Sequence, residues 1–186
     1  SGCRHASWMA AITLEDNQEK QLHLVPRDQI EFIDVWNVQG LRGTGSFHFE
    51  ADNLFVQVER ATAVAKSNPR AGPLYAIPRT SLFNCGFGNV ALGVSRAGLD
   101  ATLELAQEKK AQFAKQTLAH NPIVQNHIGQ AEAKWRAAEA LLDNTTAAVW
   151  ERVKREGDIS FDDRIQLRMA STHAIRQSAE VIDIVY

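Results

Sequence analysis

The sequence predicts an α+β fold, in which a partial antiparallel β-domain precedes an up-and-down bundle of long helices. Residues 1–60 contain short segments where apolar and polar residues alternate, which is the period of a β-strand. From residue 81 onward, apolar residues recur at spacings of three and four, the period of an amphipathic helix. The stretch between them holds the turn-forming run Ser-Asn-Pro-Arg-Ala-Gly-Pro. We therefore expect a β-region at 1–60, a linker at 61–80 and a helical bundle domain at 81–186.

The β-region has five candidate strands. Pro26 ends the second one, because proline cannot donate a hydrogen bond to a neighbouring strand. The third carries apolar residues on both of its faces, which predicts a strand that is covered on both sides. The expected strands are Trp8–Ile12, Gln21–Val25, 30–36, 46–50 and Leu54–Val56.

The first of three predicted helices begins at Ser81 and runs to about Ala114. Several glycines interrupt it, and glycine repeated in a helix indicates close approach by a neighbouring backbone. Its apolar residues step by four and three, so we expect them to form one buried stripe. That stripe is Phe83, Phe87, Val90, Val94, Ala97 and Ala101, and the glycines are Gly86, Gly88, Gly93 and Gly98.

The other two helices have clear start and stop signals. Pro122 opens the second helix at a first-turn position, and Gly157 follows its last residue, Glu156. Ser160 is the expected N-cap of the third helix, which begins at Phe161 and has a mixed apolar and polar stripe. Three long helices make an incomplete four-helix bundle. A fourth helix or a second copy of the chain would have to cover the open stripe.

Composition excludes several classes of function. The net charge is −2 and there is no basic block, so we expect no nucleic-acid partner and no anionic membrane surface. No apolar run approaches the roughly 20 residues of a membrane span. The two cysteines form no disulfide framework, which indicates a reducing compartment, and we expect a soluble cytoplasmic protein. No cysteine or carboxylate stands at ligand spacing from His120 or His127, so no metal site is expected.

A glycine-rich loop at 34–46 joins two of the predicted strands. It contains the aromatic face of Trp36 and hydrogen-bond donors from Arg42, Thr44 and Ser46. Local chemistry leaves two interpretations open. The loop is either a hairpin with a buried tryptophan or a binding loop whose glycines let the backbone approach a ligand.

Two runs of the sequence resemble the acyl-CoA dehydrogenase superfamily. The first is Gly-Leu-Arg-Gly-Thr-Gly-Ser at 40–46, a short strand, and then Asp-Asn-Leu-Phe-Val-Gln-Val-Glu-Arg at 52–60, similar to the end of the middle β-domain of these proteins. The second, at 89–100, is similar to the first helix of their C-terminal four-helix bundle. The resemblance implies the second part of such a protein, without its N-terminal helical domain and its last bundle helix.

The opening residues 1–8, Ser-Gly-Cys-Arg-His-Ala-Ser-Trp, resemble a strand of the flavin-dependent two-component monooxygenases of this superfamily, of the p-hydroxyphenylacetate hydroxylase and dibenzothiophene monooxygenase type. The resemblance implies an oxygenase component that uses reduced FMN or FAD and dioxygen. Its substrate would be an aromatic or heterocyclic small molecule, and its partner a separate flavin reductase. Family members are usually homotetramers, which implies the same here.

The resemblance also implies roles for individual residues. Ser1 matches a catalytic serine beside the flavin N5, and Trp36 matches a tryptophan packed against the isoalloxazine. Ser46 matches a hydroxyl that contacts the flavin, and Thr44 and Arg42 stand in the same loop. Lys110 stands where the dehydrogenases place an arginine that reaches the flavin pyrophosphate of a neighbouring subunit. Lysine keeps the charge without the bidentate fork, which suits a flavin that arrives and leaves.

Two other functions stay open at this point. An acyl-CoA dehydrogenase or oxidase with bound FAD would need a carboxylate to take a proton from the thioester, and Glu104 is a poor match for that base. A non-catalytic oligomerisation fragment would use only the helical stripes. The chain lacks an initiator methionine and stops within an apolar pattern. We therefore expect a fragment, with little or no catalysis when it is isolated.

Overall fold

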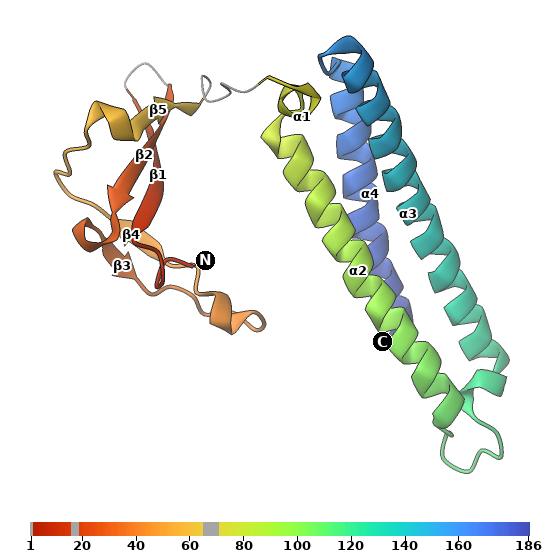
Figure 1. The fold of residues 1–186 in the computed structure, drawn as a ribbon. Coiled ribbons are helices and arrows are strands. Elements are labelled where there is room, and N and C mark those ends of the chain that lie inside the picture. Colours follow the sequence, from red (N-terminus) through yellow and green to blue (C-terminus); the bar gives the residue numbers. More distant parts are fainter. Residues whose placement is uncertain (1, 16–18, 65–70) are drawn as a thin grey trace. The chain divides into compact units, whose positions relative to one another are not determined.

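The computed structural model describes residues 2–15, 19–64 and 71–186. The chain divides into two compact units, Ser1–Arg70 and Ala71–Tyr186, and each is described by itself. The first contains short antiparallel strands and the second contains long helices, which confirms the predicted α+β class (Figure 1).

The first unit holds two small sheets. Strands β1 (Trp8–Leu14) and β2 (Lys20–Pro26) pair antiparallel over their whole length, and β5 (Ala61–Ala63) pairs with β2 on its other edge. Strands β3 (Glu31–Ile33) and β4 (His48–Glu50) form a separate antiparallel pair (Figure 1). The sheets bury few side chains, because Cys3 and Val25 are the buried apolar residues among those described in this unit.

Two expectations for this unit were wrong. Residues 54–56 form no strand, and the strand in this region is β5 instead. The segment 30–36 is a strand only at β3, and Ile33 and Val35 are exposed rather than covered. The reason for the early end is a turn, in which the Asp34 carboxylate accepts a hydrogen bond from the Trp36 N–H at 3.2 Å. An Asx turn of this kind competes with strand pairing.

The second unit contains a short helix, α1 (Pro73–Ala76), and three long ones, α2 (Arg79–Glu108), α3 (Pro122–Glu156) and α4 (Phe161–Val185). The long helices lie side by side (Figure 1). The predicted bounds of the second and third helices are confirmed. The Asn121 side chain caps α3, Gly157 ends it at φ 76°, and Ser160 forms a capping box with Asp163 at the start of α4.

The helix α2 ends six residues before the predicted Ala114. The chain then turns back on itself, because Lys110 pairs with Thr117 and the Leu118 N–H donates to the Lys109 carbonyl at 2.9 Å. The predicted linker at 61–80 contains β5, α1 and the first residues of α2.

The buried face of α2 was also predicted wrongly. Phe83, Phe87, Val90 and Val94 are 62–65 % exposed. The face that packs on α3 and α4 is the next one around the helix, and it contains small residues. A Cβ added to Gly88 would lie 3.1 Å from Leu142 Cδ2 and 3.5 Å from Ser171 Cα. Close packing through small residues therefore decides which face is buried. The buried residues of α2 are Gly88, Leu92, Ser95, Leu99 and Ala106.

Three apolar clusters form the core of this unit. At one end, Ile77 packs with residues of α3 and α4, and at the other, Leu99 packs with Ala131 and Val181. The middle cluster consists of Leu92, Ala138, Leu142, Ala170 and Ala174. Among the described residues, no helix has both the length and the apolar character needed to cross a membrane.

Candidate functional site

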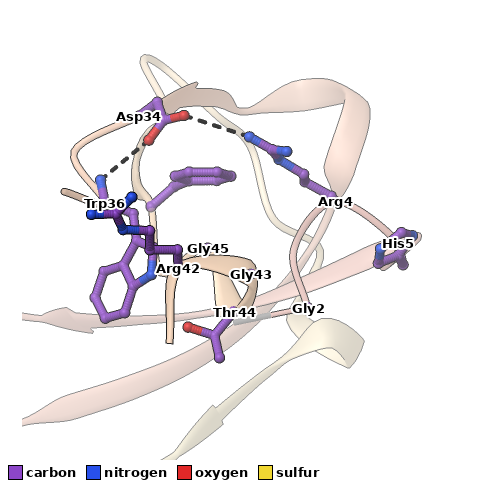
Figure 2. A pocket seen from close by; sticks show the side chains of 10 residues that line it. Gly2, Arg4, His5, Asp34, Trp36, Arg42, Gly43, Thr44 and Gly45 are labelled. Atoms are coloured by element: carbon purple, nitrogen blue, oxygen red, sulfur yellow. Dashed lines mark hydrogen bonds and ion pairs between the residues drawn. The ribbon is translucent and has the colours of Figure 1, made fainter. Parts of the chain in front are cut away.

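A pocket of about 360 Å³ lies in the first unit, between the turn near the N-terminus and the glycine-rich loop. Pockets that hold small molecules begin at about this size. Figure 2 shows the side chains around it, with Arg42 beside the indole of Trp36 and with Arg4 on the other side of the pocket, where it is joined to Asp34. The lining residues are Gly2, Arg4, His5, Asp34, Trp36, Arg42, Gly43, Thr44, Gly45 and Phe47.

The N-terminal wall of the pocket is a tight turn. The Gly2 carbonyl accepts hydrogen bonds from the N–H groups of His5 and Ala6, at 3.0 and 3.1 Å. Gly2 has φ 82°, a conformation that glycine adopts without strain. Cys3 is buried, and its carbonyl accepts a hydrogen bond from Arg27 Nε at 3.2 Å. The turn is therefore anchored to the strand region, and it presents Arg4 and His5 to the pocket.

The opposite wall is a loop held by its own hydrogen bonds. The Leu41 carbonyl accepts one from the Trp36 indole at 3.0 Å and one from the Thr44 hydroxyl at 2.9 Å. Arg42 Nε donates to the Val38 carbonyl at 3.1 Å, which uses only one of the guanidinium donors. Gly45 has φ 54°, and a Cβ there would lie 3.2 Å from the ring of Phe47. The loop therefore fixes an aromatic face, a hydroxyl and a cation on one side of the pocket.

The pocket carries more positive than negative charge. Its cationic side chains are Arg4 and Arg42, and its carboxylate is Asp34, which pairs with Arg4 at 3.5 Å. His5 adds an imidazole to the lining. Flat aromatic surfaces beside guanidinium and hydroxyl donors suit a planar heteroaromatic ligand with anionic or carbonyl oxygens.

The structure brings together three of the predicted site residues, Trp36, Arg42 and Thr44. Ser46 is half-buried and lies outside the lining of this pocket. Ser1, the predicted catalytic residue, lies outside the described residues. Lys110 belongs to the second unit, where it is exposed just beyond the end of α2.

Sequence reasoning gave no role to Arg4, Asp34 or Phe47, although all three line the pocket. Arg4 and His5 stand inside the opening run that carries the resemblance, so their position there was a usable signal. Asp34 is the first residue of the glycine-rich loop and Phe47 follows its last residue, and residues at the ends of a loop often set its geometry.

Two other kinds of site receive no support. Burial raises the pKa of the Cys85 thiol, and Cys85 packs against two core clusters, so it is a structural residue rather than a nucleophile. In the described part of the chain, no group of three or more His, Cys, Asp or Glu side chains is arranged to hold a metal ion.

Residues 85–186 match the family model of the acyl-CoA dehydrogenase C-terminal domain. Because this match spans more than half of the chain, the chain belongs to that family. The resemblance drawn from the sequence to this superfamily is confirmed.

Relatives of the chain include monooxygenases, one of which is named as flavin-dependent. Indole-3-acetate monooxygenase of Pseudomonas putida is 32 % identical over 162 residues, which are 87 % of this chain and 41 % of that protein. The flavin-dependent monooxygenase oxygenase subunit HsaA of Rhodococcus jostii (strain RHA1) is 27 % identical over 98 % of this chain and 51 % of its own length. The chain thus spans about half the length of these relatives.

A solved structure agrees with these sequence matches. The crystal structure of 3-HSA hydroxylase from Rhodococcus sp. RHA1 superposes with a TM-score of 0.82 and 25 % identity. The superposition covers 100 % of this chain and 51 % of that one. The monooxygenase branch that the opening residues indicated is therefore the branch of the matched proteins.

Proposed function

We propose that this chain is part of the oxygenase component of a two-component flavin-dependent monooxygenase. The observation that carries the proposal is the convergence of two separate motifs on one pocket. Gly2, Arg4 and His5 come from the opening run, and Trp36 and Thr44 from the glycine-rich run. The opening run resembles the monooxygenase branch and the glycine-rich run resembles the superfamily as a whole, and the similarity to indole-3-acetate monooxygenase and HsaA supports the same function.

The residues of the pocket fit a flavin. Trp36 supplies a flat surface for the isoalloxazine, and the Thr44 hydroxyl and the Arg42 guanidinium supply donors for its ring oxygens and nitrogens. Reduced flavin would supply the electrons that activate dioxygen. The residues of this chain would bind and orient the flavin. The proposal includes flavin contacts by Ser1, Ser46 and Lys110. Titration with both FMN and FAD determines which flavin the protein prefers.

The proposed substrate is an aromatic or heterocyclic small molecule, and the proposed partner is a flavin reductase in the same cytoplasmic compartment. Indole-3-acetate is the first compound to test, because the relative of 32 % identity is named for it. A phenol serves as the second.

The experiment is anaerobic titration of the full-length protein with reduced FMN and reduced FAD, followed by a reaction with a reductase, NADH, dioxygen and the aromatic compounds. Use of ¹⁸O₂ should place one labelled oxygen atom in the product. If the protein instead purifies with tightly bound FAD that an acyl-CoA reduces, the dehydrogenase function replaces this proposal.

We also infer that copies of the chain associate, as a homotetramer, through the outer face of α2. This face is the row Phe83, Phe87, Val90 and Val94, whose side chains are 62–65 % exposed. A contiguous row of large apolar side chains along three turns of a helix favours burial against another protein surface.

A further inference from the structure

The two walls of the pocket come from segments that are about thirty residues apart in sequence. The turn at residues 2–6 forms one wall and the loop at 34–47 forms the other. Each segment is held by its own hydrogen bonds, which are between backbone groups in the turn and are donated by side chains as well in the loop. The width of the pocket therefore depends on the contacts that join the turn to the loop.

Arg4 reaches the first residue of that loop. Its Nη2 lies 3.5 Å from Oδ2 of Asp34, and the other carboxylate oxygen, Oδ1, accepts the N–H of Trp36 at 3.2 Å. Figure 2 draws both interactions. The Asp34 carboxylate thus links the guanidinium of Arg4 to the backbone at Trp36.

Arg4 also reaches the other end of the loop. Its guanidinium carbon lies 4.6 Å from the centroid of the Phe47 ring, a distance typical of a cation–π contact. The same ring packs against Gly45, where an added Cβ would lie 3.2 Å away. A single side chain therefore contacts both ends of the wall that carries Trp36, Arg42 and Thr44.

We propose that Arg4 is a positioning residue for the ligand of this pocket. It sets the position of Trp36 through Asp34 and closes the end of the loop through Phe47. The ligand readout below rests on the proposed function, whereas the structural readout is independent of it. Because the side chains of Arg4 and Asp34 are 67 % and 65 % exposed, each contact is individually weak, and we expect a modest effect that salt reduces.

The test uses Arg4→Met, which removes the charge and keeps a long apolar side chain. The first readout needs no flavin: ¹⁵N NMR measures hydrogen exchange at the Trp36 indole N–H, which donates to the Leu41 carbonyl. A Trp36→Phe spectrum assigns the signal. We expect exchange about threefold to tenfold faster in Arg4→Met, and a similar change in Asp34→Asn.

The second readout is the Kd of reduced FMN, measured anaerobically. We expect Arg4→Met to raise it about threefold to tenfold, and Arg4→Lys to restore most of the affinity because it keeps the charge. The Arg4→Met/Asp34→Asn double variant should bind no more weakly than the weaker single variant, because both changes break one linkage. In 1 M salt the difference between Arg4→Met and the wild type should shrink.

Arg60→Met is the matched control. Arg60 lies 4.6 Å over the ring of Trp8 in the same unit, outside the lining of this pocket. The Arg60→Met variant should change the NMR signal of the Trp8 indole N–H, and it should leave the exchange rate of the Trp36 indole N–H and the Kd of reduced FMN unchanged. Equal Trp36 exchange and equal Kd in Arg4→Met and the wild type would overturn the positioning role and leave the proposed function intact.

The remaining outcomes also decide the question. If the wild type does not bind reduced flavin, the proposed function fails. The exchange rate of the Trp36 indole N–H then tests by itself whether Arg4 positions the loop. If Arg4→Met does not fold by circular dichroism, Asp34→Asn and Arg4→Lys carry the test. The proposal then requires faster Trp36 exchange in Asp34→Asn and near-normal exchange in Arg4→Lys.

Discussion

The indole N–H of Trp36 donates a 3.0 Å hydrogen bond to the main-chain carbonyl of Leu41, five residues further along the chain. Leu41 has φ 53°, a left-handed conformation that costs a non-glycine residue about 1–2 kcal/mol. The Thr44 hydroxyl donates to the same carbonyl at 2.9 Å. The aromatic and hydroxyl groups proposed to contact the flavin therefore also hold the strained turn between them.

Replacing Trp36 by phenylalanine should weaken flavin binding although an aromatic ring remains. The variant loses the hydrogen bond to Leu41, which contributes about 1 kcal/mol, and we expect the Kd of reduced FMN to rise about fivefold. Trp8→Phe, in the same unit but outside the pocket, should bind flavin like the wild type. Anaerobic fluorescence titration measures both. An unchanged Kd in Trp36→Phe would mean that the indole hydrogen bond has no role in binding.

Lys110 should affect phosphate-bearing flavins only. The resemblance places its ammonium near the flavin pyrophosphate of a neighbouring subunit. The phosphate of FMN corresponds to the inner phosphate of that group, so Lys110→Ala should raise the Kd of FMN and FAD about threefold to tenfold and leave riboflavin unchanged. Lys110→Arg should tighten FMN and FAD binding, because guanidinium binds phosphate through two donors. The neighbouring exposed Lys109→Ala is the control. Equal effects of Lys109→Ala and Lys110→Ala would indicate general electrostatics.

Local signals in the sequence were enough to predict both limits of α3 and the start of α4. Asn121 and Pro122 before α3, Gly157 after it and Ser160 before α4 act on their immediate neighbours, so they can be read without the fold. The buried face of α2 could not be predicted in this way. Two faces of that helix have the same period, and Gly88 gains its importance from its contacts with Leu142 and Ser171, which the sequence does not show.

The pocket was predictable in part for a similar reason. Trp36, Arg42 and Thr44 stand in one short run, so a motif identifies them together. Arg4 meets Asp34 and Phe47 only because the first unit folds the turn against the loop. An ion pair between residues thirty positions apart has no local pattern.

Alanine substitutions at two glycines of α2 should change the free energy of unfolding in opposite directions. Gly93→Ala should raise the free energy of unfolding by about 1 kcal/mol, because alanine favours the helix and, apart from the adjoining backbone of α2 itself, no atom lies within 4 Å of the added Cβ. Gly88→Ala should lower it by about 1–3 kcal/mol, because the new Cβ meets Leu142 and the backbone of Ser171. Denaturant unfolding followed by circular dichroism measures both. Stabilisation by Gly88→Ala would contradict the packing described for this face.

Asp163 should make the stability of the helical unit depend on pH. Burial alone raises the pKa of this carboxyl, but hydrogen bonds from Arg152 and Ser160 and the charge of Arg152 outweigh it, so the pKa lies below its ordinary value. A carboxyl with a lowered pKa contributes stability that is present at neutral pH. That contribution is lost as the pH falls from about 5 downward.

Asp163→Asn should therefore lower the free energy of unfolding at pH 7 by about 2 kcal/mol, because it leaves Arg152, only 32 % exposed, without its counter-ion. It should also reduce the loss of stability below pH 5. Asp162→Asn changes an exposed carboxylate of the same helical turn and should cost about 0.5 kcal/mol or less. An unchanged slope of stability against pH in Asp163→Asn would show that other carboxylates, such as Glu132 with its lowered pKa, control acid unfolding.

The outer face of α2 should control self-association. Phe87 is 65 % exposed and Val94 is 62 % exposed, two turns apart on one face, so each copy would remove a large apolar surface from water on assembly. Phe87→Ser/Val94→Ser should shift the protein from an oligomer to smaller species in size-exclusion chromatography with light scattering.

The control is Leu141→Ser, which changes an exposed leucine on α3 and should leave the mass unchanged. Helix content should stay the same in both variants, because these side chains lie outside the three core clusters. The proposed self-association would be contradicted if the wild type is monomeric at every concentration tested, or if the Phe87→Ser/Val94→Ser variant keeps the mass of the oligomer. This apolar row would then contact another partner.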